Sequence, residues 1–147
     1  MKAVDGDMPV AFGERFARNA VLGMAGLGLF IAVAVVAQGN VVAFIGSVIV
    51  QALSHFFRRR ALYDAQRGRH ALEDERDRTL LARGDGMFRL VASTWMVGLA
   101  IALAVPSLRE MLLAPSLRVS GMLLLGVVVA NIAGHGAVSV HYRRNRA

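Results

Sequence analysis

The chain has 147 residues, of which 56% are hydrophobic, and it carries a formal net charge of +7. A single soluble core of this size could not bury so much apolar surface. The charges are clustered between long uncharged runs, which is typical of integral membrane proteins. The absence of cysteine excludes disulfides, thiolate metal sites and cysteine nucleophiles. Because the basic residues flank apolar spans, we expect them to meet anionic lipid headgroups in the bilayer, with no direct contact to nucleic acid.

Residues 19–57 contain no Asp, Glu, Lys or Arg. About 20 residues cross the hydrocarbon core as a helix, so this run is long enough for two crossings. A polar, flexible Gln-Gly-Asn segment at residues 38–40 lies near its middle, and Gly and Asn tolerate the left-handed backbone of a tight turn. The sequence therefore predicts transmembrane helices at about residues 18–37 and 41–57.

The first helix has an alternative reading as a signal peptide cleaved after Ala37. Its apolar run exceeds the roughly 7–15 residues of a signal hydrophobic region, and the leader ahead of it is long. We therefore expect the helix to stay. Cleavage would leave three spans and put the termini on opposite sides of the membrane.

The segment 58–87 is predicted to be a cytoplasmic helical extension between the second and third spans. Its helix is expected to run to residue 83, with a favourable charge pair between Asp74 and Arg78. The Gly84-Asp85-Gly86 sequence is expected to break the helix, with Asp85 capping the third span.

A dense charged block lies within this extension. We interpret it as a solvated helix face or as a docking surface for a cytosolic protein. A divalent-ion site is the third reading, but Glu75 would point away from the face that Glu73 and Asp77 share. The candidate docking residues are Glu73, Asp74, Glu75, Arg76, Asp77 and Arg78. Arg58, Arg59 and Arg60 follow two phenylalanines and are predicted to anchor the helix end to lipid phosphates.

Two further spans are predicted at about residues 88–106 and 119–141. Pro106 should close the first of them, because proline cannot donate the next helical hydrogen bond. In the connecting loop, the apolar patch at residues 111–113 is expected to rest at the membrane interface. The predicted fold is thus an all-α, four-helix transmembrane bundle of two antiparallel hairpins.

The distribution of basic residues predicts the orientation. Of the 17 Lys and Arg residues, all but Arg109 and Arg118 lie in the N-terminal tail, the central extension or the C-terminal tail, or within the first two residues of an adjoining span. Cytoplasmic segments carry the excess of Lys and Arg. We therefore expect both termini to lie in the cytoplasm.

Two predicted spans carry polar faces at four-residue spacing: Ser47, Gln51 and His55, and then Asn131, His135 and Ser139. Counting to the inner arginines puts the two faces at similar depth, so we expect them to meet inside the bundle. The main interpretation is interhelical hydrogen bonding. A polar cavity or ion path is the alternative. No third ligand accompanies His55 and His135, which argues against a metal site.

Small residues four positions apart favour close helix packing, either within one chain or between the two chains of a homodimer, and the sequence leaves both alternatives open. They are Gly28 and Ala32, Gly98 and Ala102, and Gly126, Ala130 and Gly134.

The chain resembles the small membrane proteins of domain of unknown function 2178. The resemblance rests on the Arg58–Arg60 exit, the block Glu73-Asp74-Glu75-Arg76, the pair Phe88-Arg89 and the tail His141-Tyr142-Arg143-Arg144. It would cover nearly the whole chain, and the glycine break at residues 84–86 departs from it. The resemblance implies a four-helix prokaryotic inner-membrane protein with no assigned reaction, and a small transcription regulator as a partner.

No nucleophile–base pair, phosphate-binding loop or zinc-protease motif occurs in the sequence, so we expect no enzyme activity and no cofactor. Two hypotheses follow. The chain is an interaction or regulatory protein that presents its charged cytoplasmic helix to a partner, or it is a small oligomeric channel or transporter that uses the polar face.

Overall fold

The computed structural model describes residues 12–67 and 75–144 of the chain. The elements in chain order are α1 (Phe12–Phe30), η1 (Ile31–Ala37), α2 (Val41–Arg67), α3 (Glu75–Ala104), α4 (Pro106–Leu113) and α5 (Arg118–Arg144). The π-helix η1 follows directly on α1. The described residues form helices and no strand, which confirms the predicted all-α class.

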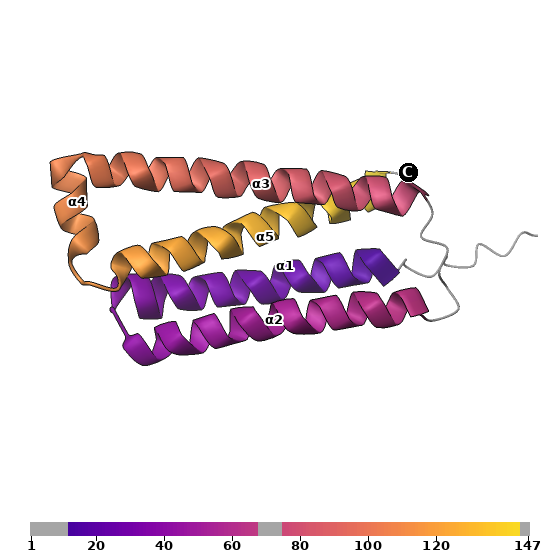
Figure 1. Cartoon of the computed structure of the whole chain (residues 1–147), viewed down its shortest axis with the longest axis horizontal. Helices are drawn as coiled ribbons and strands as arrows, with labels where there is room; N and C mark the ends of the chain where they lie inside the picture. The colour runs from indigo at the N-terminus through magenta and orange to yellow at the C-terminus, as the bar shows by residue number, and fades with distance from the viewer. Residues whose placement is uncertain (1–11, 68–74, 145–147) are drawn as a thin grey trace, which may run out of the picture.

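The long helices run lengthwise through the molecule, and α4 crosses one end of it (Figure 1). α1 and α3 run in one direction, and α2 and α5 run in the other. α5 is central because it packs against α1 and η1 as well as against α3.

Three segments are long and apolar enough to cross a membrane: Ala17–Ala37, Ala82–Ala104 and Arg118–His141. The apolar stretch of α2, Val41–Ser54, is shorter. These lengths are consistent with a membrane protein.

The predicted turn between the first two helices is confirmed. Gly39 has a φ of +67°, the left-handed conformation that glycine adopts without steric cost. The N–H groups of Gly39 and Asn40 donate to the carbonyls of Val35 (2.9 Å) and Ala34 (3.0 Å), which closes η1. The Asn40 Oδ1 accepts a hydrogen bond from the Ala43 N–H (3.0 Å) and so caps the start of α2.

Glycines on α5 let neighbouring elements approach closely. A Cβ at Gly121 would lie 2.8 Å from Cγ1 of Val35 in η1. A Cβ at Gly126 would overlap the indole of Trp95 in α3, whose Nε1 donates to the Met122 carbonyl at 2.9 Å. These contacts explain why Gly121 and Gly126 are buried.

The predicted helix break at residues 84–86 is wrong. α3 runs without interruption from Glu75 to Ala104, so Asp85 does not cap a span and lies exposed in mid-helix. Gly84 instead faces Gly134 of α5. A Cβ at Gly84 would lie 3.1 Å from the Gly134 carbonyl oxygen and 2.7 Å from Cγ2 of Val138. Close helix packing, rather than a turn, accounts for this glycine.

Other predictions have mixed results. α3 ends at Ala104 and α4 begins at Pro106, so the predicted stop at this proline is confirmed. Gly28 is buried against Val128, as its small size suggested. Gly98, in contrast, is exposed, and a Cβ there would meet no atom within 4 Å, so it packs against none of the helices that the structure describes.

Candidate functional site

Four residues of the predicted polar faces are buried in the structure, and we call them the inner polar layer. Ser47 and Gln51 of α2 are 1% and 6% exposed, and Asn131 and His135 of α5 are 4% and 8% exposed. Each pair is spaced by four residues, so its members share one helix face. The spacing in the sequence therefore identified two inward-facing polar pairs.

The two halves of the inner polar layer lie at matching positions along their helices. Ala43 of α2 and Val128 of α5 belong to one buried cluster, and the two helices run in the same direction (Figure 1). Gln51 follows Ala43 by eight residues and His135 follows Val128 by seven. At about 1.5 Å per residue, both residues lie roughly 11 Å beyond the cluster.

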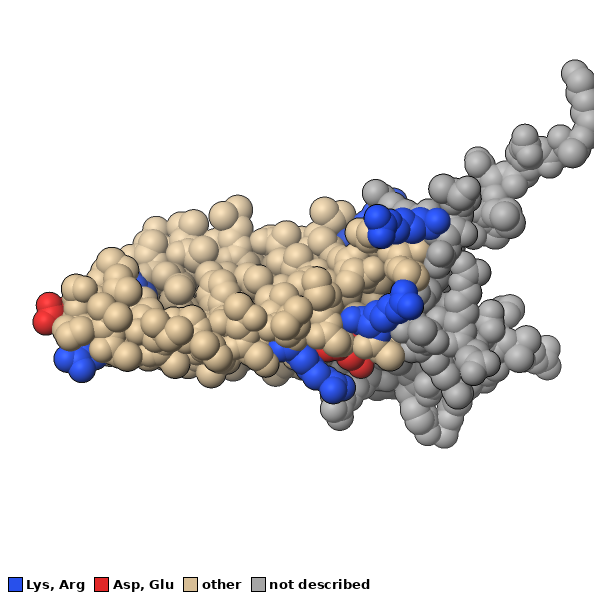
Figure 2. Space-filling view, turned by 90° about the horizontal axis from the view of Figure 1, so that it is seen from above, with Lys and Arg blue, Asp and Glu red and all other residues tan. Residues whose placement is uncertain are grey.

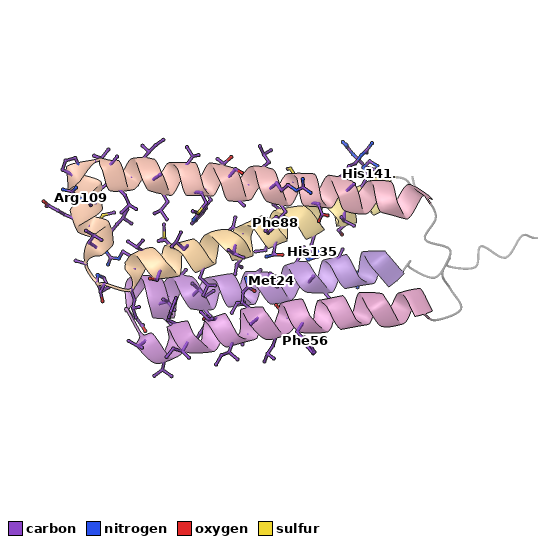
Figure 3. The ribbon with its side chains drawn as sticks, in the orientation of Figure 1. Met24, Phe56, Phe88, Arg109, His135 and His141 are labelled. Carbon is purple, nitrogen blue, oxygen red and sulfur yellow. The ribbon has the colours of Figure 1, made fainter. Side chains whose placement is uncertain are left out.

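The remaining two residues of the predicted faces are Ser139 and His55. Ser139 is half-buried. The side chain of His55 lies outside the described part of the structure. Figure 3 shows His135 and Met24 within the helical assembly and Phe56 on its outer side.

Hydrogen bonding within the layer is uneven. The Ser47 hydroxyl donates to the Ala43 carbonyl at 2.8 Å, and the Asn131 Nδ2 donates to the Val127 carbonyl at 2.9 Å. Both bonds stay within one helix. Among the described residues, Gln51 is the one whose side-chain Nε2 and Oε1 are buried with no hydrogen-bond partner. Burying an amide in this way costs about 1–3 kcal/mol.

The chemistry open to this layer is hydrogen bonding. Amides and hydroxyls can donate and accept at once, so they suit water and small uncharged solutes. Within the described residues, no three His, Asp or Glu side chains lie close enough together to hold a metal ion.

The charged block is only partly within the described residues. Glu73 and Asp74 lie outside them. Glu75, Arg76, Asp77 and Arg78 form the start of α3, but their side chains lie outside the described part, as do those of Arg58, Arg59 and Arg60 in α2. The backbone shows that residues 75–78 continue into the apolar part of α3 without a break.

Most of the described charges lie towards the two ends of the molecule, and uncharged residues cover most of the surface between them on the face shown in Figure 2. At the end where α3 begins and α5 finishes, Arg18, Arg83 and Arg144 are exposed. Arg83 also donates from Nη1 to Nε2 of His141 at 3.0 Å, which links α3 to α5. At the opposite end, α4 carries the exposed Arg109 and Glu110.

Arg118 has a structural role that the sequence analysis missed. Its Nε donates to the Val36 carbonyl at 3.2 Å, and its Nη1 donates to the Met111 carbonyl. Both carbonyls lie in the last turn of a helical element, where the backbone leaves acceptors without helical partners. Arg118 therefore joins the ends of η1 and α4 to the start of α5. A lone arginine between two uncharged runs was the one signal in the sequence.

Comparisons of the chain with models of known protein families, with curated proteins and with solved structures find no match.

Proposed function

We propose that this chain is a multi-pass inner-membrane protein that anchors a charged helical segment and presents it to a cytosolic protein. The observation that carries this proposal is the unbroken course of α3. Its apolar span begins at Ala82, so the seven residues from Glu75 to Leu81 extend the same helix by roughly 10 Å. Residues 75–78 would then sit on a rigid continuation of a membrane span.

Four crossings are part of the proposal. α1 and α3 run in the same direction, so the chain has to return between them, and α2 makes that return (Figure 1). The uncharged part of α2 reaches Phe57, which gives 17 residues and about 25 Å of helix. This is near the lower limit for a crossing. Arginines at residues 58–60 would extend the helix into the anionic headgroup layer.

The same arrangement supports a cytoplasmic location of both termini as part of the proposal. The beginning of α1, the beginning of α3 and the end of α5 lie at one end of the molecule (Figure 1). Fifteen of the 17 basic residues belong to sequence segments that adjoin this end, and only Arg109 and Arg118 belong to the opposite end. The positive-inside rule therefore favours a cytoplasmic location for the basic end.

The partner that suits the charged block is a cytosolic protein with a complementary charge pattern. Electrostatic complementarity mainly sets specificity and the rate of association. The resemblance to domain of unknown function 2178 favours a small transcription regulator. This resemblance and a homodimeric state remain predictions.

Reversing the charge block tests the proposal. Cells that express the full chain would be treated with a crosslinker. The proteins captured with the original chain and with each variant would then be compared by quantitative mass spectrometry. We expect Glu73→Lys combined with Asp77→Lys to remove the specific partner. The matched control is Asp85→Lys, which reverses an exposed acid farther along α3. An unchanged set of captured proteins in the double variant would refute the proposal.

The inner polar layer favours a second candidate function, a small channel or transporter for uncharged polar solutes. The specific observation is the unpaired amide of Gln51 in a buried position. Protein reconstituted into vesicles would be assayed for water and urea flux by light scattering. Flux should fall when Gln51, His55, Asn131 and His135 are replaced by alanine. Water and urea flux that is unchanged by all four replacements would eliminate this candidate function.

A further inference from the structure

The short helix α4 turns across the end of the molecule where η1 ends and α5 begins (Figure 1). Extended residues flank it on both sides: Val105 with φ −85° and ψ 119°, and Ala114 with φ −118° and ψ 110°. Leu112 is 6% exposed and packs toward the long helices. α4 therefore has one face directed into the assembly and another directed away from it.

The apolar residues of α4 gather on one side of its axis, and one charged residue lies among them. At about 100° per residue, Leu108 shares the inward face with Leu112, while Met111 and Leu113 project to the two flanks. Glu110 projects away from the assembly. Although Leu108, Met111 and Leu113 are apolar, they are 41%, 57% and 56% exposed. The apolar residues of α4 thus face inward and sideways, and Glu110 faces outward. Arg109 is exposed but lies about 60° around the axis from Leu112, on the side of Leu113.

Contacts with its neighbours fix the level of α4. Arg118 bonds the Met111 carbonyl of α4 and the Val36 carbonyl of η1. The Pro115 ring also packs on the turn before α2, since a Cβ at Gly39 would lie 3.1 Å from Pro115 Cγ. α4 is therefore held level with the ends of the apolar segments Ala17–Ala37 and Arg118–His141.

That level corresponds to a bilayer boundary. The 24 residues of Arg118–His141 span about 36 Å as a helix. A hydrocarbon core is about 30 Å thick, so the two ends of this segment fall near its two surfaces. Arg118 lies at one of these surfaces and His141, bonded to Arg83, at the other.

We propose that α4 is an interfacial helix whose partner is the lipid surface itself. Leu108, Met111 and Leu113 enter the boundary between headgroups and acyl chains, and Glu110 faces water. An amphipathic helix that lies in the interface plane binds through buried apolar area. Arg109 and Glu110 give α4 no net charge, so its binding does not depend on anionic lipid.

Site-directed spin labelling tests the proposal on the full chain, because the absence of cysteine leaves no background. Single variants Met111→Cys, Leu113→Cys and Glu110→Cys would be labelled with a nitroxide in phosphatidylcholine vesicles. Val97→Cys, on the exposed side of the α3 span, is the reference. Collision rates with oxygen, which concentrates in lipid, and with a water-soluble nickel chelate then report the depth of each label.

We expect the ratio of oxygen collisions to nickel collisions at Met111 and Leu113 to lie between the high ratio at Val97 and the low ratio at Glu110. The depth should not change when anionic lipid or salt is added. Labels at Met111 and Leu113 as accessible to nickel as Glu110 would overturn the proposal, and so would a depth that requires anionic lipid. Nickel access at Val97 would overturn the membrane span itself, which separates that failure from a failure of α4 alone.

Discussion

Alanine at Gly84 should destabilise the protein, whereas alanine at Gly86 should not. Both glycines lie within α3, two residues apart. A Cβ at Gly84 would lie 2.7 Å from Cγ2 of Val138 and 3.1 Å from the Gly134 carbonyl oxygen, whereas a Cβ at Gly86 would meet nothing within 4 Å. Overpacking of this kind costs about 1–3 kcal/mol. Replacing glycine by alanine within a helix contributes about 0.5–1 kcal/mol of stability in both variants.

The difference between the two variants isolates the overpacking, because the helix-propensity gain is common to both. We expect Gly84→Ala to have a free energy of unfolding about 1–3 kcal/mol below that of Gly86→Ala. Unfolding would be followed in mixed detergent micelles by the fluorescence of Trp95, the single tryptophan, which lies between α3 and α5. Adding Val138→Ala should recover part of the loss. Equal stability of the two glycine variants would refute the close crossing of α3 and α5.

Gln51→Met should raise the free energy of unfolding by about 1–2 kcal/mol, because it removes an unpaired buried amide at similar volume; a loss in the same micelle titration would show that the amide is hydrogen-bonded in the folded protein. Gly126→Ala should cost about 1–3 kcal/mol by displacing the Trp95 indole, and in a Trp95→Leu background the cost should shrink. Arg118→Gln should cost about 1.5–3 kcal/mol, because charged hydrogen bonds to two carbonyls are lost. The exposed Arg109→Gln is its control and should stay within about 0.5 kcal/mol; equal losses would mean that the carbonyl contacts contribute nothing.

The sequence predicts features that depend on the chain's own local chemistry. Uncharged runs indicate which helices are apolar enough to cross a membrane, Gly39 permits the turn, and Pro106 stops α3, because each effect acts within a few residues. Four-residue spacing also identifies Gln51 and His135 as inward-facing, since helix geometry alone fixes which residues share a face.

Features that depend on what lies opposite a helix were not predictable in this way. The spacing of glycines gives no information about the neighbour, so Gly84 was interpreted as a helix break and Gly98 as a packing residue. In the structure Gly84 lies against α5, and Gly98 is open. The bonds of Arg118 to the ends of two other helical elements could not be predicted for the same reason, because they join segments brought together only by the fold.

The unequal attachment of α2 and α3 bears on how the charged segment would be displayed. α3 is fixed to α5 at two levels, by Gly84 against Gly134 and by Trp95 over Gly126. Displacing the end of α3 that begins at Glu75 would press Val138 against the backbone at Gly84, or the Trp95 indole against the backbone at Gly126, where no free space remains. The buried polar face of α2, in contrast, includes the unpaired Gln51. If the proposed function holds, the backbone at residues 75–78 would therefore be held in place by α3, and any rearrangement that accompanies partner binding would be carried by α2.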